Sequence, residues 1–519
     1  MRSSTLRSRP WAQPAVACLL IAATAASRVP FTSQMLYAWA PANFALALQQ
    51  YNVVFHQPHP PGYPLYVGIA KLVDLWVQNP NASLVYVGIA ASAGAVAALF
   101  LLASRMYDVW VGIGSAVILG ASVGFWGYGE VAYPHTSVAF FGTLLAWLCY
   151  LMWQGHRSVA VLSGLVLGIA GGVRQDTLLF LGPLWLLSVW RTGFLRLLLS
   201  ALVLCLVAAS WTIPAVQLSG GWEAYWQAVE AQSSHALSAH SLIFAGGVDL
   251  GRNMDTLLLF LQQTFGLSLA VTVYFAGRFL TFKALVADHR LSFLLLWLLP
   301  PTIAYLLVQV DDPGYVLSLL PVVSIVTGIA VRDIAYDIRS ALLLLSSRSR
   351  RLSPLAGLAG WGPPSLGSLL VAGLVAWNVH AFVATPGPVR LTEIRAIDNM
   401  VAKQVEYARQ FQPGTVVILA MERFRQFKYY LPEYDLRPLF DEHQGGYRET
   451  RSRYTIPAGV TTVLVMDFGK EPASIPSELG EEVPVDSDPR RPVGLWRFAV
   501  SPGDTIEYGY DYFAVNGRS

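Results

Sequence analysis

Long apolar segments separated by short polar connections make up most of the sequence before residue 386. A helix needs about 20 mostly apolar residues to cross the hydrocarbon core of a bilayer. This pattern predicts an all-α polytopic membrane protein. The segments of spanning length or near it lie at 14–29, 61–78, 82–104, 109–124, 134–153, 158–172, 177–190, 197–213, 255–276, 291–310, 314–332 and 365–385.

The segment at 61–78 differs from the others. It carries Lys71 and Asp74, which are costly in a helix that faces lipid. If it lies along the membrane and the N-terminus is cytoplasmic, most basic loop residues, including those at 332–351, fall on the cytoplasmic side. We therefore predict about eleven transmembrane helices, membrane-surface helices in the first outer loop, and a C-terminal region outside the cytoplasm.

The first apolar segment has a second interpretation. A basic start, a short apolar core and the small residues at 22–27 also fit a cleaved signal peptide. Cleavage would leave the rest of the topology unchanged.

The pattern changes after residue 385. A helical pattern at 391–411 is followed by apolar runs of strand length at 415–420 and 461–466. We expect a transmembrane domain at 1–385 and a small extracytoplasmic α/β domain at 386–519.

Composition agrees with the membrane class. Of the 519 residues, 54% are hydrophobic and 13% are charged. The net charge of +3 is too small to indicate a nucleic-acid partner. The three cysteines lie in apolar segments and form neither a disulfide framework nor a CxxC metal pattern.

A proline-rich stretch with two histidines, at 56–64, follows the first apolar segment. Its prolines favour a stiff, extended backbone. Non-helical backbone at membrane depth is tolerated where protein buries it or where it lines a watery cavity. The stretch is therefore a candidate rim of a site, and a rigid connector with solvated histidines is the alternative.

The predicted topology places several polar positions on the outer face. Glu130 stands among aromatic residues between two predicted helices, where partial desolvation would raise its pKa towards that of a useful base. A solvated loop acid is the alternative. Arg174 could hold a phosphate or pair with Asp176, and the helix dipole alone would favour an acid at Asp176.

Two further outer-face features are less specific. Asp311 and Asp312 could bind a divalent cation, although adjacent carboxylates on a turn are more often solvated. No cluster has compelling metal-ligand spacing, so no cofactor is certain. Trp222, Tyr225 and Trp226 share one helical face, which is typical of a helix in the membrane interface or of a general aromatic belt.

The chain resembles the glycosyltransferase-C (GT-C) superfamily, which includes protein O-mannosyltransferases and lipid A aminoarabinose transferases. The resemblance is carried by the stretches 59–66, 126–130, 313–317 with 320–321, and 429–432. It implies a bacterial inner-membrane enzyme that moves a sugar from a polyprenyl-phosphate donor to a glycan, lipid or protein acceptor outside the cytoplasm, with inversion. Phosphate is a good leaving group, so charge stabilisation and a carboxylate base would suffice.

Site roles follow from the resemblance and from the residue types. Glu130 is the expected base or acceptor-positioning acid, His59 and Arg174 the expected contacts of the donor phosphate, and Asn43 a residue lining the site. The further candidates for substrate binding are His56, Tyr63, Tyr128, His135 and Asp176.

The chain departs from the family pattern at one position. Similar proteins usually carry an aspartate early in the first outer loop, and Ala40 occupies that position within the stretch 39–46. Either another carboxylate serves as the base, or the protein is a catalytically inactive relative that binds a lipid-linked glycan or a partner enzyme. A transporter is a third possibility, although no internal repeat supports it.

Overall fold

The computed structural model describes residues 12–242, 250–279, 288–308, 310–348, 360, 362–421, 423–439, 452–466, 480–486, 493–509 and 513–516. These residues form two compact units, each assembled from separate stretches of chain. The helical unit comprises the described residues up to Thr32, Tyr63–Ala215 and Leu237–Thr392. The mixed unit comprises Ser33–Gly62, Val216–Ala236 and the described residues from Glu393 onwards.

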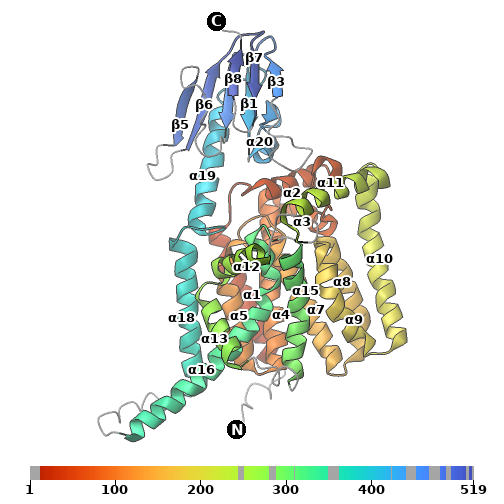
Figure 1. Cartoon of the computed structure of the whole chain (residues 1–519), viewed down its shortest axis with the longest axis vertical. Helices are drawn as coiled ribbons and strands as arrows, with labels where there is room; N and C mark the ends of the chain where they lie inside the picture. Colours follow the sequence, from red (N-terminus) through yellow and green to blue (C-terminus); the bar gives the residue numbers. More distant parts are fainter. Residues whose placement is uncertain are drawn as a thin grey trace. The chain divides into compact units, whose positions relative to one another are not determined.

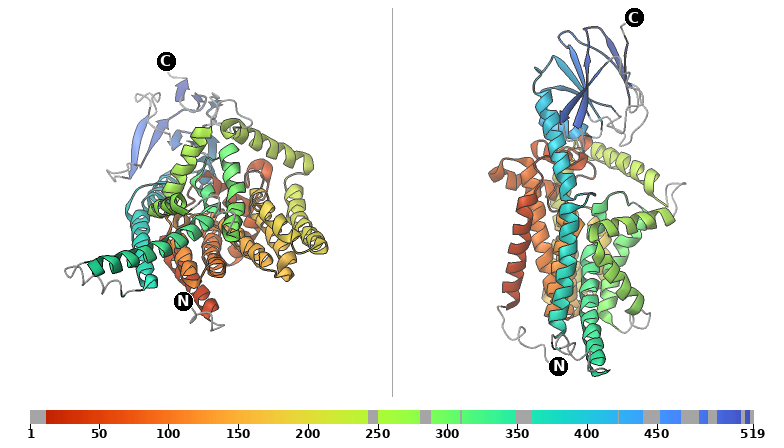
Figure 2. Two further views of the ribbon diagram at one scale, coloured as in Figure 1. Left: turned by 60° about the horizontal axis from the view of Figure 1, so that its bottom comes forward. Right: turned by 90° about the vertical axis from the view of Figure 1, so that its left-hand side faces the viewer.

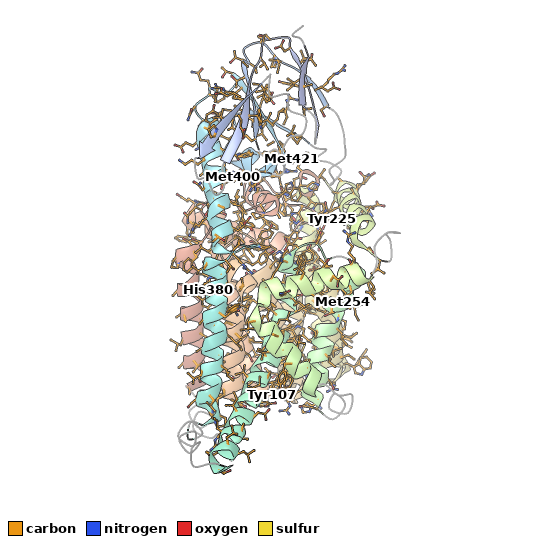
Figure 3. The ribbon with its side chains drawn as sticks, turned by 60° about the vertical axis from the view of Figure 1, so that its left-hand side comes forward. Tyr107, Tyr225, Met254, His380, Met400 and Met421 are labelled. Atoms are coloured by element: carbon orange, nitrogen blue, oxygen red, sulfur yellow. The ribbon has the colours of Figure 1, made fainter. Side chains whose placement is uncertain are left out.

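The helical unit is a bundle of apolar helices around α4, which packs against α1, α3, α5 and α7 (Figure 1). Figure 2 shows the bundle from two further sides, and Figure 3 shows side chains filling the spaces between its helices. The helices are α1 (Ala12–Arg28), α3 (Pro64–Val77), α4 (Pro80–Met106), α5 (Val109–Ala121), α6 (Val123–Gly127), α7 (His135–Trp153), α8 (Ala160–Val173), α9 (Asp176–Trp190), α10 (Phe194–Leu218), α12 (Leu250–Phe265), α13 (Leu267–Phe279), α15 (His289–Leu307), α16 (Leu320–Arg348) and α18 (Pro363–Ala384).

The helices have the apolar character of membrane spans, which confirms the predicted class. Within the described residues, six are long and apolar enough to cross a bilayer, and the bent pair α12–α13 would make a seventh. Three shorter apolar helices, which include α5 and α9, accompany them. The predicted number of about eleven spans stays a prediction, as does the orientation of the termini.

Two predicted segments differ in the structure. The apolar segment predicted at 255–276 is divided between two helices, because the chain bends by 120° between α12 and α13. Gly266 stands at the break with φ of +58°, a conformation that glycine adopts at little cost. The segment expected at 314–332 begins as a 3₁₀ helix at Pro313–Ser318 before α16 starts at Leu320.

Helix α3 falls within the segment that we predicted not to cross the membrane. Its 14 residues, at 1.5 Å each, give a length of about 21 Å. A hydrocarbon core is about 30 Å thick, so this helix alone is too short to span it. Lys71 is exposed, and Asp74 accepts a hydrogen bond from Ser83 at 2.7 Å.

The mixed unit contains two sheets. The first has the order β2-β1-β4-β6-β5, with β1 parallel to both β2 and β4, and the second has the antiparallel order β3-β7-β8. The predicted helix at 391–411 and the strands at 415–420 and 461–466 are present as α19, β1 and β4. The elements are α2 (Trp39–Gln49), α11 (Trp222–His240, which continues into the helical unit), α19 (Leu391–Ala408), α20 (Phe424–Tyr430), β1 (Val416–Ala420), β2 (Asp435–Pro438), β3 (Ser452–Thr455), β4 (Thr462–Met466), β5 (Glu481–Asp486), β6 (Val493–Ala499), β7 (Thr505–Tyr508) and β8 (Phe513–Asn516).

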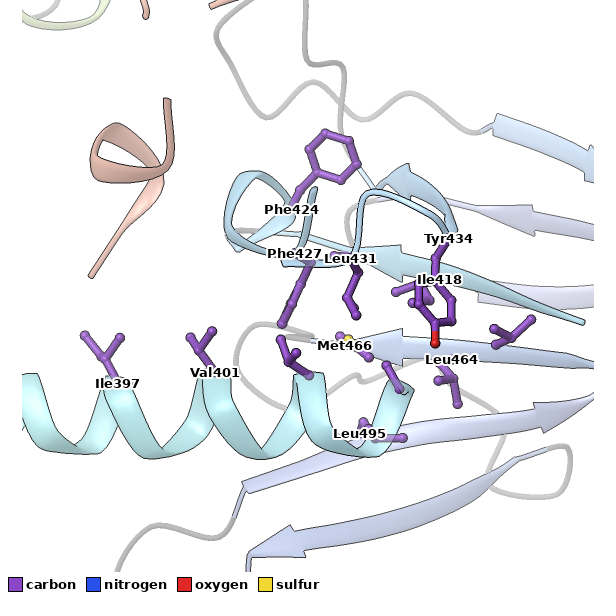
Figure 4. Packing of buried hydrophobic residues seen from close by; sticks show 14 residues of the cluster. Ile397, Val401, Ile418, Phe424, Phe427, Leu431, Tyr434, Leu464, Met466 and Leu495 are labelled. Atoms are coloured by element: carbon purple, nitrogen blue, oxygen red, sulfur yellow. The ribbon is translucent and has the colours of Figure 1, made fainter. Parts of the chain in front are cut away.

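Strand β1 is buried on both faces, as expected for a continuous apolar run in a central strand. On one face, Ile418 packs with residues of α19 and α20, including Val401 and Phe427 (Figure 4). On the other face, Val417 and Leu419 belong to an apolar cluster that includes Ile506 of the second sheet. This double burial makes β1 the centre of the mixed unit.

The segment before α2 is tied to the mixed unit through α19. The carboxylate of Asp398 accepts hydrogen bonds from the backbone N–H groups of Gln34 and Met35, at 3.0 and 2.8 Å. Burial raises the pKa of Asp398, and the two backbone donors oppose that rise. A residue early in the chain is thus held by one more than 360 positions later.

We expect Gly164→Ala to destabilise the protein. A Cβ atom at Gly164 of α8 would lie 2.2 Å from the carbonyl oxygen of Ser200 in α10, so the helices would have to separate. Overpacking of this kind costs about 1–3 kcal/mol. Thermal unfolding in detergent measures the effect. The control is Gly373→Ala in α18, where nothing lies within 4 Å and alanine favours a helix. Equal melting temperatures for the two variants would contradict the expectation.

Replacing Asp398 should loosen the segment before α2. Asp398→Ala leaves the two N–H groups without their acceptor, at a cost of about 1–3 kcal/mol, whereas Asp398→Asn keeps an acceptor oxygen. Amide hydrogen exchange at Gln34 and Met35 should therefore be much faster in the alanine variant than in the asparagine variant. Unchanged protection in the alanine variant would show that these bonds do not hold the segment.

Candidate functional site

The predicted site residues fall into two groups, one in each unit. Tyr63, Tyr128, Glu130, His135, Arg174 and Asp176 belong to the helical unit, and Asn43, His56 and His59 belong to the mixed unit. In the helical unit, most of the group gathers around Asp312, a residue that the sequence suggested only as a cation ligand or a solvated acid.

Asp312 precedes the 3₁₀ helix Pro313–Ser318 and caps it. Its Oδ1 atom accepts the backbone N–H of Gly314 at 2.6 Å and the hydroxyl of Tyr128 at 2.7 Å. The side chain remains 31% exposed. Burial raises the pKa of Asp312, and the hydrogen bonds from Tyr128 and Gly314 oppose that rise. Asp312 is therefore a carboxylate that is both held in place and accessible.

His135, the first residue of α7, connects Asp312 to Arg174. Arg174 Nη1 lies 3.1 Å from His135 Nδ1, and a guanidinium can only donate, so Nδ1 is the acceptor. The ring proton is then on Nε2, which lies 3.4 Å from Asp312 Oδ1. Gly314 permits this approach, because a Cβ atom there would lie 2.3 Å from the His135 ring.

Arg174 lies in the turn between α8 and α9. Its Nη2 atom is 2.8 Å from Asp176 Oδ2 at the start of α9, so the pairing considered for these two residues is present. Its guanidinium also stacks over the ring of Tyr315, 4.4 Å from the centroid. Arg174 is buried, and its positive charge is therefore poorly screened by solvent.

Aromatic rings line this charged cluster. His135 stacks on Tyr133 and meets the edges of Tyr128 and Tyr315. Burial raises the pKa of Tyr63 to about 12, and the nearby charge of Arg174 opposes that rise. The sequence missed Tyr133 and Tyr315 as parts of the site. The motif Pro313-Gly314-Tyr315 in the resemblance could have indicated the latter.

Glu130 has different surroundings. Its side chain is fully buried, with 0% exposure, and its charge acts on the equally buried Arg28 of α1. Arg28 also donates to the carbonyl of Gly120 and lies over the ring of Trp126, 4.8 Å from the centroid. The role of Glu130 as a base stays a prediction, but this carboxylate faces protein on all sides.

In the mixed unit, the two histidines of the proline-rich loop pack around Trp39. The centroids of His56 and His59 each lie 5.6 Å from that of Trp39, and His59 also contacts Phe44. Arg425 of α20 donates a hydrogen bond to the carbonyl of Phe55, just before the loop, at 3.1 Å. These contacts give both histidines a packing role.

Helix α2 carries the two remaining positions of interest in the mixed unit. Asn43 is fully buried in this helix, and neither end of its amide has a hydrogen-bond partner among the described residues. Ala40 lies half-buried in the first turn of the same helix.

The aromatic residues of α11 divide into two kinds. Trp222 and Trp226 stack with centroids 5.8 Å apart and are 64% and 52% exposed. Tyr225, labelled in Figure 3, is buried instead and donates to the carbonyl of Pro61 at 2.8 Å. Of the three aromatic residues expected on one exposed helical face, only the two tryptophans are exposed. Tyr225 is instead hydrogen-bonded to the proline-rich loop.

Among the described residues, no group of three or more His, Cys, Asp or Glu side chains could hold a metal ion. Asp311 is exposed beside Asp312, and the binding of a divalent cation by this pair stays a prediction. The chemistry that the cluster itself offers is a carboxylate acceptor beside a histidine N–H and a guanidinium.

Comparison with solved structures identifies the fold, whereas no protein-family model and no curated protein sequence matches the chain. The crystal structure of ArnT from Cupriavidus metallidurans bound to undecaprenyl phosphate matches with a TM-score of 0.59 and 11% identity, covering 95% of this chain and 98% of ArnT. The apo form of ArnT matches with a TM-score of 0.55 and 11% identity over 94% and 97%. An Archaeoglobus fulgidus oligosaccharyltransferase matches less well, with a TM-score of 0.46 and 12% identity over 88% and 69%.

The ArnT matches extend over nearly the whole of both chains, so the likeness concerns the complete architecture. ArnT is a lipid A aminoarabinose transferase of the GT-C superfamily. This protein has an ArnT-like polytopic membrane fold.

Proposed function

We propose that the protein is a membrane glycosyltransferase that moves a sugar from a polyprenyl-phosphate donor to an acceptor outside the cytoplasm, with inversion at the anomeric carbon. The observation that carries the proposal is the cluster of Asp312, His135 and Arg174 on an ArnT-like fold. A carboxylate and a guanidinium on either side of a histidine suit a reaction that removes one proton and releases one phosphate.

Asp312 is the proposed base. The acceptor hydroxyl would attack the anomeric carbon while the bond from that carbon to the donor phosphate breaks, and Asp312 would take the hydroxyl proton. Asp312 is 31% exposed whereas Glu130 has 0% exposure, and a general base must come within hydrogen-bond distance of its substrate. Asp312 would thereby take the place of the acid that Ala40 does not supply.

Arg174 is the proposed stabiliser of the departing phosphate, and its poor screening strengthens the effect of its guanidinium on a developing negative charge. His135, which lies between Arg174 and Asp312, would position the two groups relative to each other. Asp176 would position Arg174 through their 2.8 Å ion pair. Tyr63 and Tyr128 would form the wall of the site.

A second function is supported by one residue. Ala40 stands where similar proteins have an acid, and a relative that binds a lipid-linked glycan without transferring it would have no need of one. The family resemblance supports a location in the bacterial inner membrane, and the distribution of basic residues supports a position of the Asp312 cluster at the outer boundary of that membrane.

The first test compares two carboxylate variants. Asp312→Asn should lower transfer from polyprenyl-phosphate sugars by about 10²–10⁴-fold, because general-base catalysis contributes that much. Glu130→Gln should instead lower the melting temperature, because it leaves Arg28 without its buried partner, at about 3–5 kcal/mol. Purified protein and a panel of donor sugars supply the measurement.

The outcomes separate the possible roles. Loss of transfer in folded Glu130→Gln, with transfer retained in Asp312→Asn, would return the role of base to Glu130. No turnover by the wild type across the panel, with lipid binding retained, would favour the binding function. In that case a gain of turnover in Ala40→Asp would identify a decayed enzyme.

The pH profile of transfer provides a second test. The base must be deprotonated, and burial raises the pKa of Asp312, so kcat/KM should fall with decreasing pH at a value above the ordinary aspartate pKa of about 3.9. The hydrogen bond from Tyr128 favours the charged form of Asp312, so in Tyr128→Phe the fall in kcat/KM should occur at a higher pH than in the wild type. A fall at the same pH in both proteins would show that another group sets the pH profile.

A further inference from the structure

A groove lies in the helical unit between α5, α16 and α18, which pack against one another. It has a volume of 490 Å³, within the range of about 300–1,000 Å³ typical of ligand pockets. Its walls are mainly aliphatic and include Ile113, Val117, Val331 and Val371. An apolar groove between membrane helices suits a hydrocarbon chain.

The groove also has a charged side, formed by Asp108 and Arg332. Asp108 caps α5 by accepting the N–H groups of Trp110 and Val111 with Oδ1. Its Oδ2 lies 3.5 Å from Arg332 Nη1, and Arg332 Nη2 lies 2.9 Å from Asp333 Oδ1. All three side chains are about 30% exposed, so their charges remain accessible to a ligand.

This charged side lies at the start of α5, next to Tyr107, which Figure 3 labels. The lining of the groove shares no residue with the Asp312 cluster. Trp110 and Tyr336 line the groove and are about half exposed. Trp110 lies in the first turn of α5 and Tyr336 lies one turn after Arg332 in α16; partly exposed tryptophan and tyrosine beside charged side chains are typical of the level of lipid head groups.

We propose that this groove binds a phospholipid whose head group carries a primary ammonium beside its phosphate. Asp108 and Arg332 line the groove, and Asp333, which pairs with Arg332 beside the lining, brings a second carboxylate, so these three side chains together carry a net charge of −1. An anionic head group would meet net repulsion there, whereas an ammonium can approach the carboxylates while the phosphate approaches Arg332. The acyl chain lies against the aliphatic wall, where burial of apolar surface favours binding.

Native mass spectrometry of the detergent-purified protein tests the proposal with two lipids of identical acyl chains. We expect phosphatidylethanolamine to bind about tenfold more tightly than phosphatidylglycerol, a difference of about 1.4 kcal/mol. Equal binding of the two lipids, or tighter binding of phosphatidylglycerol, would overturn the proposal without any variant being needed.

Two variants locate the site. Gly114→Leu places a side chain in the groove at a position where a Cβ atom would be 3.7 Å from Val371, an ordinary contact, and should abolish binding of both lipids. Asp108→Asn keeps a residue that caps helices well but removes one negative charge, and should make the two lipids bind equally. Asp255→Asn, at an exposed position of α12 outside the groove lining, is the matched control.

Each variant result bears on the proposal. Undiminished binding to Gly114→Leu with a wild-type melting temperature would exclude the groove. If Gly114→Leu does not fold, Asp108→Asn decides: an unchanged preference for phosphatidylethanolamine would refute the proposed head-group contacts, and a lost preference would support them.

Discussion

Charged side chains inside an apolar helix bundle must be paired, and this constraint organises the helical unit. An unpaired buried charge costs several kcal/mol, so each ion is held by an opposite charge or by hydrogen bonds. One such group of paired side chains comes from three interhelical segments that are far apart in sequence. It consists of Asp312, His135, Arg174 and Asp176. The pairing fixes the starts of α7 and α9 and the 3₁₀ helix after α15 relative to one another. The same pairing creates the candidate site.

The second buried pair shows how pairing and accessibility conflict. Arg28 and Glu130 are both almost completely buried, with Trp126 packed on the guanidinium. The attraction between these two charges connects α1 to the turn after α6, but the enclosed carboxylate is not presented to a substrate. Asp312 differs because its side chain stays 31% exposed, although Tyr128, Gly314 and His135 all lie at its Oδ1 atom. This exposure is the reason that we propose Asp312 as the base.

The mixed unit meets its constraints mainly by apolar packing. Its central strand β1 is buried on both sides, and Trp39 brings the histidines of the proline-rich loop into an aromatic cluster. Polar contacts such as those of Asp398 and Arg425 then hold the segments before and after α2. The positions of His56 and His59 in the loop at 56–64 are thus set by contacts with Trp39 and Phe44.

The sequence by itself determined the class of the protein, because hydrophobic length and charge distribution are local properties that lipid imposes directly. It also indicated the helix and strands after residue 390, and it named Arg174, His135 and Tyr128 as site candidates, which lie together around Asp312. It could not show the break at Gly266, since an apolar run has the same composition whether straight or bent. Nor could it rank Glu130 against Asp312. Both are acids beside aromatic residues in sequence, and only the tertiary structure decides which one is enclosed, because burial depends on helices that are distant along the chain.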